Sequence, residues 1–432
     1  MQVFKFGGAS IQNAASIQQL EQIIKAKYTC PLVIVVSALG KTTSSLEDIF
    51  YQNLAKKSYT QTLHRLYQFH QTIIDQLLTT LRQAAHQTLM LWQQQLTATL
   101  SLPITDTTLD MRYSSVVATG ELLASKLIDY YLKEKHWTCA WLDARAYIKT
   151  KEDYFCNAPV DWITTQNLVK KLRPSLHKKS LLLTQGFISS NTAGETTTLG
   201  KEGSDFTGAI LATTLKAQSL TIWKDVPGIM HADPNLFKKA TKFEQISYHT
   251  VEKMAFYGAK IIHPQTIHPL ATHNIPLYVK PFYCPHETGT IVKQESIQLN
   301  APVCIIQDNQ LLLQITSLDR FKVFNQEQLQ DILHQLGQQK FCINMLVSNP
   351  YKMLVCVNNN LYKLPQLLAA LSHRYKVNNH IQVKLLTILH QEIHLLQQWQ
   401  QKKDSALLTQ QRPGIYQAVC SKSVMTPYGY LP

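Results

Sequence analysis

Residues 196–212, TTTLGKEGSDFTGAILA, place Gly200, Gly203 and Gly208 within nine positions of a chain that holds only 15 glycines in 432 residues. That content is about half the usual frequency of roughly 7%. Where glycine is scarce, each one more often meets a backbone demand, such as positive φ or close approach to a ligand. The stretch then becomes an apolar helical pattern, and a helix N-terminus favours anions. The segment therefore indicates an anion-binding turn.

Charged side chains in the same stretch could take part in that chemistry. Lys201 and Asp205 offer opposite charges four residues apart. The alternative is an ordinary helix capped by Ser204 or Asp205. A cap alone does not account for the TTTLGKEG that precedes it.

Lysines beside glycines recur at two other places. Lys5 stands just before Gly7 and Gly8 in KFGG, and Lys260 stands near Gly258 in FYGAKIIHPQT. A lysine beside bare backbone N–H groups can form a phosphate cradle, although a lysine at the edge of a sheet is the common alternative. In VVSALGKTT (35–43), the hydroxyl groups of Ser37 and Thr43 fit helix capping as well as substrate contact.

The elements between these turns alternate. Apolar runs predict strands at 2–6, 31–38, 181–186, 220–226 and 275–280, and helical patterns predict helices at 121–133, 204–216 and 249–259. Alternation of this kind predicts an α/β fold with an open, mainly parallel sheet and helices on both faces. Ligands bind beyond the carboxyl ends of such strands, which is where the glycine clusters fall. A glutamine-rich helical segment over 46–100 is expected to pack on the sheet.

The pattern changes after about residue 300. Strands and helices follow in the order β-α-β-β-α-β, which predicts a smaller α+β domain with two helices over an antiparallel sheet. We expect a first domain over 1–290 and a linker over 291–305. A second domain is expected over 306–385, and a truncated second unit with a tail over 386–432.

Composition excludes several classes of protein. No apolar run approaches the roughly 18 residues of a membrane span, and the first residues lack the layout of a secretory signal. The eight cysteines lie singly, without a CxxC pair, which suits a reducing cytoplasm. The net charge of +14 comes without an arginine-rich run, so we expect no nucleic-acid partner. Three histidines, His263, His268 and His273, could suggest a metal site. Their spacing of five residues fits neither one face of a helix nor a zinc finger, so we expect no metal site there.

In consecutive order, KFGGAS, VVSALGKTT, ATGELLASKL, QGFI, TTTLGKEGSD, WKDVPGI, ADP and FYGAKIIHP make residues 1–290 resemble the aspartate kinases of the amino-acid kinase superfamily. The resemblance implies ATP-dependent phosphorylation of the aspartate β-carboxylate to aspartyl phosphate, with Mg²⁺ carried on ATP and no protein ligand to the metal. This is the first step of lysine, threonine and methionine synthesis. The region after 300 resembles the ACT regulatory domains of these kinases, which implies a cytoplasmic homodimer joined through that region.

The resemblance also implies roles for individual residues. Lys5, Asp205 and Lys260 are expected to be catalytic, the lysines supplying positive charge and Asp205 orienting a lysine. ATP is expected to contact Lys5, Phe6, Gly7, Gly8, Lys224, Asp225, Met230, Asn235, Lys260 and Ile261. Aspartate is expected to contact Ser37, Thr43, Glu121, Phe187, Lys201, Glu202, Gly203 and Ser204, with Glu121 on the α-ammonium and Lys201 on the α-carboxylate. Without the resemblance, Glu121 would read as an acid of a helix's first turn.

The chain departs from the family pattern at three positions. Lys201 stands where the family usually carries arginine. Lysine keeps the charge but lacks the guanidinium group, which can bind a carboxylate through two hydrogen bonds, and this implies weaker aspartate binding. Asn235 replaces an arginine near the nucleotide, and Met230 replaces a tyrosine. The turn 317–326 lacks the glycine usual in the effector loop, and the second ACT-like unit is short. We therefore expect weak feedback inhibition.

Two alternatives remain from the sequence. One is a related amino-acid kinase acting on another carboxylate or on UMP. The other is a catalytically impaired amino-acid sensor on a kinase fold, which the changes at Lys201 and Asn235 would favour.

Overall fold

The computed structural model describes residues 1–28, 31–173, 176, 181–295, 301–319, 323–389 and 406–421. The chain divides into two compact units. The first comprises Met1–Ile229, Lys242–Glu252 and Ile262–Ile297, and the second comprises Met230–Thr241, Lys253–Ile261 and Gln298–Pro432.

The first unit is built on an eight-stranded sheet in the order β3-β4-β2-β1-β7-β9-β10-β8. Its strands are β1 (Gln2–Phe6), β2 (Leu32–Val36), β3 (Cys139–Leu142), β4 (Leu181–Gln185), β7 (Ser219–Lys224), β8 (Gln245–Ser247), β9 (Leu277–Pro281) and β10 (Thr290–Lys293). All pairings are parallel except that of β10 with β9. A parallel sheet is buried on both faces, which explains the continuous apolar runs LVIVV and SLTIW.

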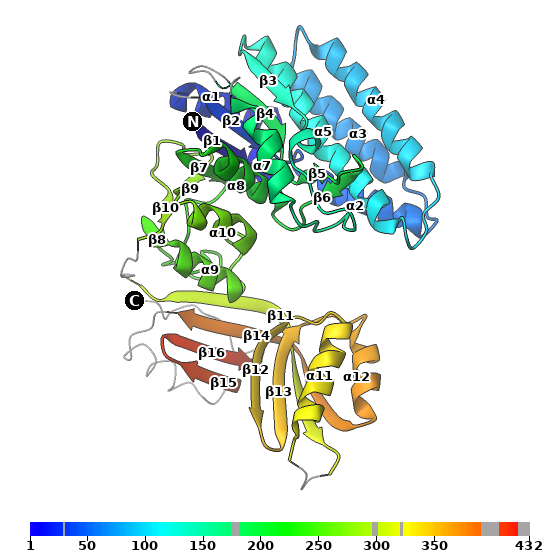
Figure 1. Cartoon of the computed structure of the whole chain (residues 1–432), viewed down its shortest axis with the longest axis vertical. Coiled ribbons are helices and arrows are strands. Elements are labelled where there is room, and N and C mark those ends of the chain that lie inside the picture. Colours follow the sequence, from blue (N-terminus) through cyan, green and yellow to red (C-terminus); the bar gives the residue numbers. More distant parts are fainter. Residues whose placement is uncertain are drawn as a thin grey trace. The chain divides into compact units, whose positions relative to one another are not determined.

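One face of this sheet is covered by a layer of long helices (Figure 1). They are α1 (Ala14–Lys27), α2 (Thr42–Leu54), α3 (Thr60–Leu77), α4 (Arg82–Ser101) and α5 (Leu109–Glu134). Their buried leucines and isoleucines form one core with Phe4, Phe6, Ile34 and Val36 of the sheet. The expected helical segment over 46–100 is therefore present, as three separate helices.

The other face carries α7 (Trp162–Lys170), α8 (Gly203–Leu215) and α10 (Pro264–Thr272), with α8 packed on β1, β2 and β7. Side chains alternate along a strand, so Lys5, between Phe4 and Phe6, points to the α8 face. A Cβ at Gly208 would lie 3.0 Å from Leu220 and 3.7 Å from Cβ of Lys5. The glycine therefore lets α8 lie close to the strand that carries Lys5.

Shorter elements complete the first unit. They are the 3₁₀ helix η1 (Gly8–Ile11), α6 (Ala144–Tyr147) and the hairpin of β5 (Ile188–Ser190) with β6 (Thr196–Thr198). Helix α9 (Tyr248–Phe256) spans the boundary between the two units.

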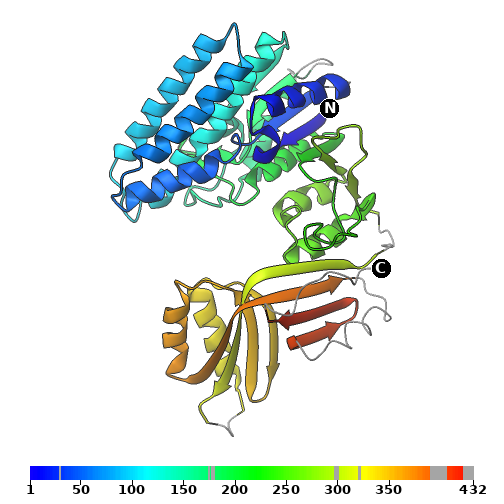
Figure 2. The ribbon, with the colours of Figure 1, turned by 180° about the vertical axis from the view of Figure 1, so that it is seen from behind.

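The second unit holds a six-stranded sheet in the order β12-β13-β11-β14-β16-β15, seen from both sides in Figures 1 and 2. Its elements are β11 (Val303–Ser317), α11 (Gln326–Gln338), β12 (Ile343–Asn349), β13 (Lys352–Asn358), α12 (Leu364–Ser372), β14 (Tyr375–Leu389), β15 (Ala406–Arg412) and β16 (Ile415–Cys420). All its pairings are antiparallel. The two helices pack on one face through Ile332, Leu336, Leu367 and Leu371.

The fold class expected from the sequence is confirmed: a mainly parallel α/β sheet between helices, followed by a βαββαβ region. Strands β11 and β14 are each 15 residues long and so extend beyond the predicted segments. Strand β10 ends at Lys293 and β11 begins at Val303, so the two strands occupy only the ends of the segment 291–305 expected as a linker. The domain bounds remain predictions, and residues 390–405 of the expected second unit lie outside the described residues. Among the described residues, the helices are all too short or too polar to cross a bilayer.

Candidate functional site

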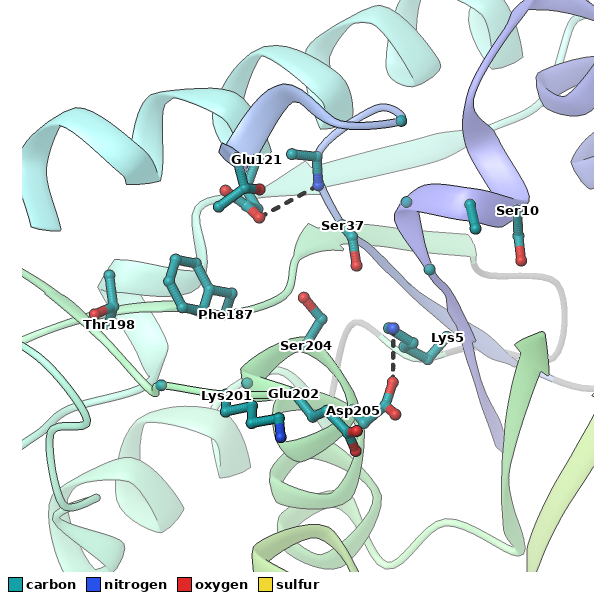
Figure 3. Close-up of a pocket in the computed structure, with 18 of the residues that line it drawn as sticks. Lys5, Ser10, Ser37, Glu121, Phe187, Thr198, Lys201, Glu202, Ser204 and Asp205 are labelled. Carbon is teal, nitrogen blue, oxygen red and sulfur yellow. Dashed lines mark hydrogen bonds and ion pairs between the residues drawn. The ribbon is translucent and has the colours of Figure 1, made fainter. Parts of the chain in front are cut away.

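A cavity of about 710 Å³ opens at the carboxyl ends of β1, β2 and β7. Its walls come from the turn after β1, the loop between β2 and α2, helix α5, the segment after β4 and the first turn of α8 (Figure 3). These segments lie far apart in the sequence, and the parallel sheet brings them to one edge, as expected for an open α/β sheet.

An ion-paired cluster lies on the sheet side of the cavity. Nζ of Lys5 lies 2.6 Å from Oδ1 of Asp205, and Nζ of Lys224 lies 3.6 Å from Oδ2. Burial would raise the pKa of Asp205, but the nearby charges of Lys5 and Lys224 outweigh it and hold that pKa below its ordinary value. Asp205 also lies in the first turn of α8, where the helix dipole favours a negative charge. The cluster thus places two cations and one carboxylate on the cavity wall.

Glycines allow the segments around this cluster to approach one another. A Cβ at Gly8 would lie 2.8 Å from the carbonyl oxygen of Gly40, and a Cβ at Gly186 would lie 2.5 Å from Cβ of Ser204. Real Cβ atoms do not reach such distances, so a larger residue at either position would push the loops apart. Gly186 therefore fixes the distance between the end of β4 and the first turn of α8.

The opposite wall carries a buried carboxylate. Glu121, on α5, is 2% exposed, and its Oε1 accepts the backbone N–H of Ala38 at 3.3 Å. Its Oε2 has no hydrogen-bond partner within the described part of the chain. Burial raises the pKa of Glu121 to about 8, although the Ala38 N–H, the Thr43 hydroxyl and Lys5 act in the opposite direction. A buried acceptor without a donor is costly, so this carboxyl is ready to receive a hydrogen-bond donor from a ligand.

Two residues of the cavity wall hold an unfavourable backbone conformation. Phe187 has φ of +67° and Glu202 has φ of +54°, in the left-handed region that favours glycine. Such conformations concentrate at functional sites, where the surrounding structure imposes them. The carboxylate of Glu202 accepts the backbone N–H of His263 at the start of α10, at 2.8 Å. Glu202 therefore joins the N-termini of α8 and α10.

Most site residues expected from the sequence line this one cavity: Lys5, Gly7, Gly8, Ser37, Thr43, Glu121, Phe187, Lys201, Glu202, Gly203, Ser204, Asp205, Lys224 and Asp225. Phe6 does not line it, because its side chain is fully buried and stacks on Trp223 in the core. Met230, Asn235, Lys260 and Ile261 belong to the second compact unit. Their roles stay predictions.

Sequence reasoning missed other residues of the wall, among them Glu47, Tyr113, Cys156, Asn157 and Thr198. The Tyr113 hydroxyl donates to Glu47 at 2.6 Å, and burial followed by this contact raises the pKa of Tyr113 above its ordinary value. A signal existed for two of them. Tyr113 precedes Glu121 by about two helical turns on α5, and Glu47 follows Thr43 by about one turn on α2. The helix predicted to begin at residue 121 begins at Leu109. Because the predicted helix did not include Tyr113, its position on the same helix as Glu121 was missed.

Comparisons with known proteins agree with this architecture. The model of the amino acid kinase family matches residues 1–281. Lysine-sensitive aspartokinase 3 of Escherichia coli is 37% identical over 207 residues, covering 47% of this chain and 45% of its own length. A chloroplastic bifunctional aspartokinase/homoserine dehydrogenase of Daucus carota is 27% identical over 68% of this chain and 32% of its own length.

The solved structure of E. coli aspartokinase III in complex with aspartate and ADP has a TM-score of 0.81 at 22% identity, covering 99% of this chain and 97% of that chain. This shows that the two chains share a fold. The chain spans about a third to just under half of the length of the curated relatives named above. Because the family model covers well over half of the sequence, the chain belongs to the amino acid kinase family.

Proposed function

We propose that this chain is an aspartate kinase, which transfers the γ-phosphoryl group of ATP to the β-carboxylate of L-aspartate. The observation that carries the proposal is that Lys5, Glu121, Lys201 and Asp205 line one cavity at the carboxyl edge of a parallel sheet. The family membership and the similarity to proteins named aspartokinases support it.

The reaction needs positive charge rather than a base. An aspartate carboxylate, with an ordinary pKa near 3.9, is already ionised at neutral pH. One of its oxygens forms a bond to the γ-phosphorus while the bond from that phosphorus to the bridging oxygen breaks, and ADP leaves with the electron pair. No proton is transferred. The barrier is the approach of two anions, so cations and oriented amides lower it.

Lys5 and Lys224 would supply that charge from adjacent strands. Their Nζ atoms both lie near the carboxylate of Asp205, which fixes them at the cavity wall. The backbone N–H groups at Gly7 and Gly8 would add oriented dipoles around the phosphoryl group. In this assignment Asp205 orients lysines and takes no proton.

The amino-acid end of the substrate would bind between Glu121 and Lys201. The unpartnered Oε2 of Glu121 suits an ammonium group, and Lys201 supplies a cation for the α-carboxylate. Ser37, Thr43, Phe187, Glu202, Gly203 and Ser204 would complete this subsite. The 710 Å³ cavity is large enough for an amino acid and a phosphoryl group together.

The nucleotide is proposed to enter as MgATP, with the magnesium ion held on the phosphates. Within the described residues, no three His, Cys, Asp or Glu side chains gather as a metal site. Asp225, next to Lys224 in sequence, lines the same cavity and is proposed to contact the nucleotide. Met230, Asn235, Lys260 and Ile261 are proposed as further contacts to the nucleotide.

We also propose the pathway, the compartment, the oligomeric state and the domain bounds of the enzyme. Aspartyl phosphate would feed lysine, threonine and methionine synthesis in the cytoplasm. A homodimer would form through the ACT-like region, and feedback control would be weak. The kinase domain is proposed over 1–290, the ACT-like domain over 306–385 and a shortened second unit over 386–432.

An ATP-dependent hydroxamate assay tests the function directly, because hydroxylamine traps an acyl phosphate only if one is made. We expect hydroxamate from aspartate and little from glutamate or N-acetylglutamate, with UMP phosphorylation followed in parallel. A preference for another acceptor would replace aspartate by a related substrate. Absence of turnover with aspartate, combined with measurable aspartate binding, would favour an amino-acid sensor.

A further inference from the structure

A histidine outside the cavity contacts the loop that forms one of its walls. His70, on α3, is 0% exposed and does not line the cavity. Its Nδ1 lies 2.8 Å from the carbonyl oxygen of Leu66, and its Nε2 lies 3.4 Å from Oγ1 of Thr42. Thr42 is the first residue of α2 and the neighbour of Thr43 on the cavity wall.

The chemistry of the contact fixes the direction of each hydrogen bond. A carbonyl oxygen can only accept a hydrogen bond, so Nδ1 of His70 is protonated and donates to the carbonyl oxygen of Leu66. Burial lowers the pKa of His70 to about 4, so the ring is neutral at pH 7 and Nε2 is an acceptor. Among the residues that the structure describes, the Thr42 hydroxyl is the donor within hydrogen-bond distance of this nitrogen. The same hydroxyl donates to the carbonyl oxygen of Leu39 at 2.6 Å, so its longer contact with Nε2 is the weaker of the two.

Thr42 also reaches the helix that carries Glu121. A Cβ at Gly120 would lie 2.9 Å from the Thr42 methyl carbon, so this methyl group packs where Gly120 lacks a side chain. Gly120 is adjacent in sequence to Glu121, whose Oε1 accepts the N–H of Ala38 in the same loop. Thr42 is therefore in contact with α3 through its hydroxyl and with α5 through its methyl group.

A second residue of α3 supports the same loop. Gly40 has φ of +55°, and a Cβ there would lie 3.3 Å from Cζ of Phe69. Phe69 therefore lies beside Gly40, and His70 contacts Thr42, so α3 flanks the loop between Ala38 and Thr43 at two positions. Two backbone hydrogen bonds join the loop to the end of β1 and the turn after it: the N–H of Gly40 donates to Gly8, and the N–H of Ser37 donates to Phe6.

We propose that His70 is a positioning residue for the amino-acid subsite: through Thr42 it holds the 37–43 loop against α5, so that Thr43 and the N–H of Ala38 keep their places beside Glu121. This rests on the proposed aspartate kinase function. Helix α3 would then support substrate binding as well as pack against the other helices. It predicts that loss of the contact weakens the amino-acid substrate and leaves the nucleotide unaffected.

Four variants in the full-length chain separate the contact from packing. Thr42→Val keeps the shape and the methyl group but removes the hydroxyl, whereas Thr42→Ser keeps the hydroxyl. His70→Asn keeps a donor for Leu66 but falls short of Thr42, whereas His70→Gln reaches Thr42. Thr88→Val is the matched control, because it removes a hydroxyl that bonds Tyr130 elsewhere in the helical layer.

We expect His70→Asn to raise KM for aspartate about fivefold, the effect of one lost neutral hydrogen bond, and Thr42→Val to raise it at least as much, because it also removes the bond to Leu39. KM for ATP should be unchanged in both. Thr42→Ser and His70→Gln should stay within about twofold of the wild type, as expected where one hydrogen bond is retained. The double variant Thr42→Val/His70→Asn should be no worse than Thr42→Val alone, because Thr42→Val already removes the contact with His70.

Hydrogen–deuterium exchange of the ligand-free protein gives a readout that does not depend on activity. Amides of residues 38–45 should exchange faster in Thr42→Val and His70→Asn, and not in Thr88→Val. If the wild type fails to phosphorylate aspartate, the proposed function fails, yet exchange still decides the contact. Unchanged exchange in that loop, equal effects of His70→Asn and His70→Gln, or parallel rises in both KM values would each overturn the proposal.

Discussion

Nζ of Lys5 lies 2.6 Å from Oδ1 of Asp205, and the side chains are only 9% and 3% exposed. Lys224 approaches the second oxygen of the same carboxylate at 3.6 Å. Asp205 thus bridges cations from β1 and β7, adjacent parallel strands whose residues Lys5 and Ile222 are in register. A change at Asp205 should therefore affect both the stability of this sheet edge and the positive charge at the proposed phosphoryl site.

Replacing Asp205 by asparagine should impair both folding stability and turnover. The buried Lys5 ammonium would lose its carboxylate partner, which costs about 3–5 kcal/mol in free energy of unfolding. The lysines would also lose their fixed positions, and we expect kcat to fall by about a hundredfold. Denaturant unfolding and steady-state kinetics measure the two effects.

Asp129→Asn is the matched control for this change. Asp129 is 1% exposed and pairs with Lys133, whose side chain is 50% exposed and can be hydrated when released. We expect a smaller loss of stability and an unchanged kcat. A wild-type kcat in Asp205→Asn would contradict the orienting role of Asp205.

Gly186→Ala should disrupt the cavity wall where the end of β4 meets the first turn of α8. The added Cβ would lie 2.5 Å from Cβ and 2.7 Å from Cα of Ser204, so the first turn of α8 must move away from β4. We expect several-fold higher KM for aspartate and a loss of stability of about 1–3 kcal/mol, typical of overpacking. Gly337→Ala is the control, since it lies in α11 with no atom within 4 Å of the added Cβ. Helix propensity predicts that it stabilises the protein by about 1 kcal/mol. Similar effects of the two changes would contradict the clash.

The sequence was sufficient for the fold class and for most of the cavity wall, because both depend on local patterns. Apolar runs ending in glycine turns locate strand ends, and parallel strands bring these ends together whatever lies between them. The pairing of Lys224 with Asp205 was not foreseen, because it depends on strand order. Likewise, a buried histidine such as His70 carries no local signal, since only tertiary packing places it beside Thr42. Lys260 shows the other limit, because it belongs to the second compact unit and its role stays a prediction.

Lys201→Arg should strengthen the binding of aspartate. Lysine offers a single ammonium group, whereas the planar guanidinium of arginine can bind a carboxylate with two hydrogen bonds. We expect KM for aspartate to fall about threefold to tenfold, as expected for one added hydrogen bond at an exposed side chain, while Lys201→Met raises it. Lys216→Arg, at the opposite end of α8, serves as the control because Lys216 is also exposed. Unchanged KM values in Lys201→Arg and Lys201→Met would remove Lys201 from the subsite.

Millimolar lysine or threonine should leave most of the activity intact. The expectation comes from the effector turn, which lacks glycine at 317–326. Residues 320–322 of that turn lie outside the described residues. Rates measured with each amino acid alone and with both together test the prediction. Strong inhibition by either one would show that feedback control is retained.

Glu121 should make aspartate binding depend steeply on pH. Its pKa is raised to about 8 by burial, so the carboxyl is mostly protonated in the ligand-free protein at pH 7. Binding of an ammonium group requires the ionised form, and KM for aspartate should therefore fall by up to about tenfold per unit as pH rises from 6 to 8. Calorimetry in buffers of different ionisation enthalpy should detect release of a proton on binding at pH 7.

The same shift predicts the pH dependence of stability. Between the ordinary value of 4.5 and about 8, the folded state holds one more proton at Glu121 than the unfolded state. The free energy of unfolding therefore falls with rising pH in this window, with a contribution from Glu121 of at most about 1.4 kcal/mol per unit. Glu121→Gln cannot ionise, so it should lack this slope, unfold at higher denaturant near pH 8, and bind aspartate weakly at every pH. A variant with the wild-type slope and a pH-dependent KM would show that another group titrates in the cavity.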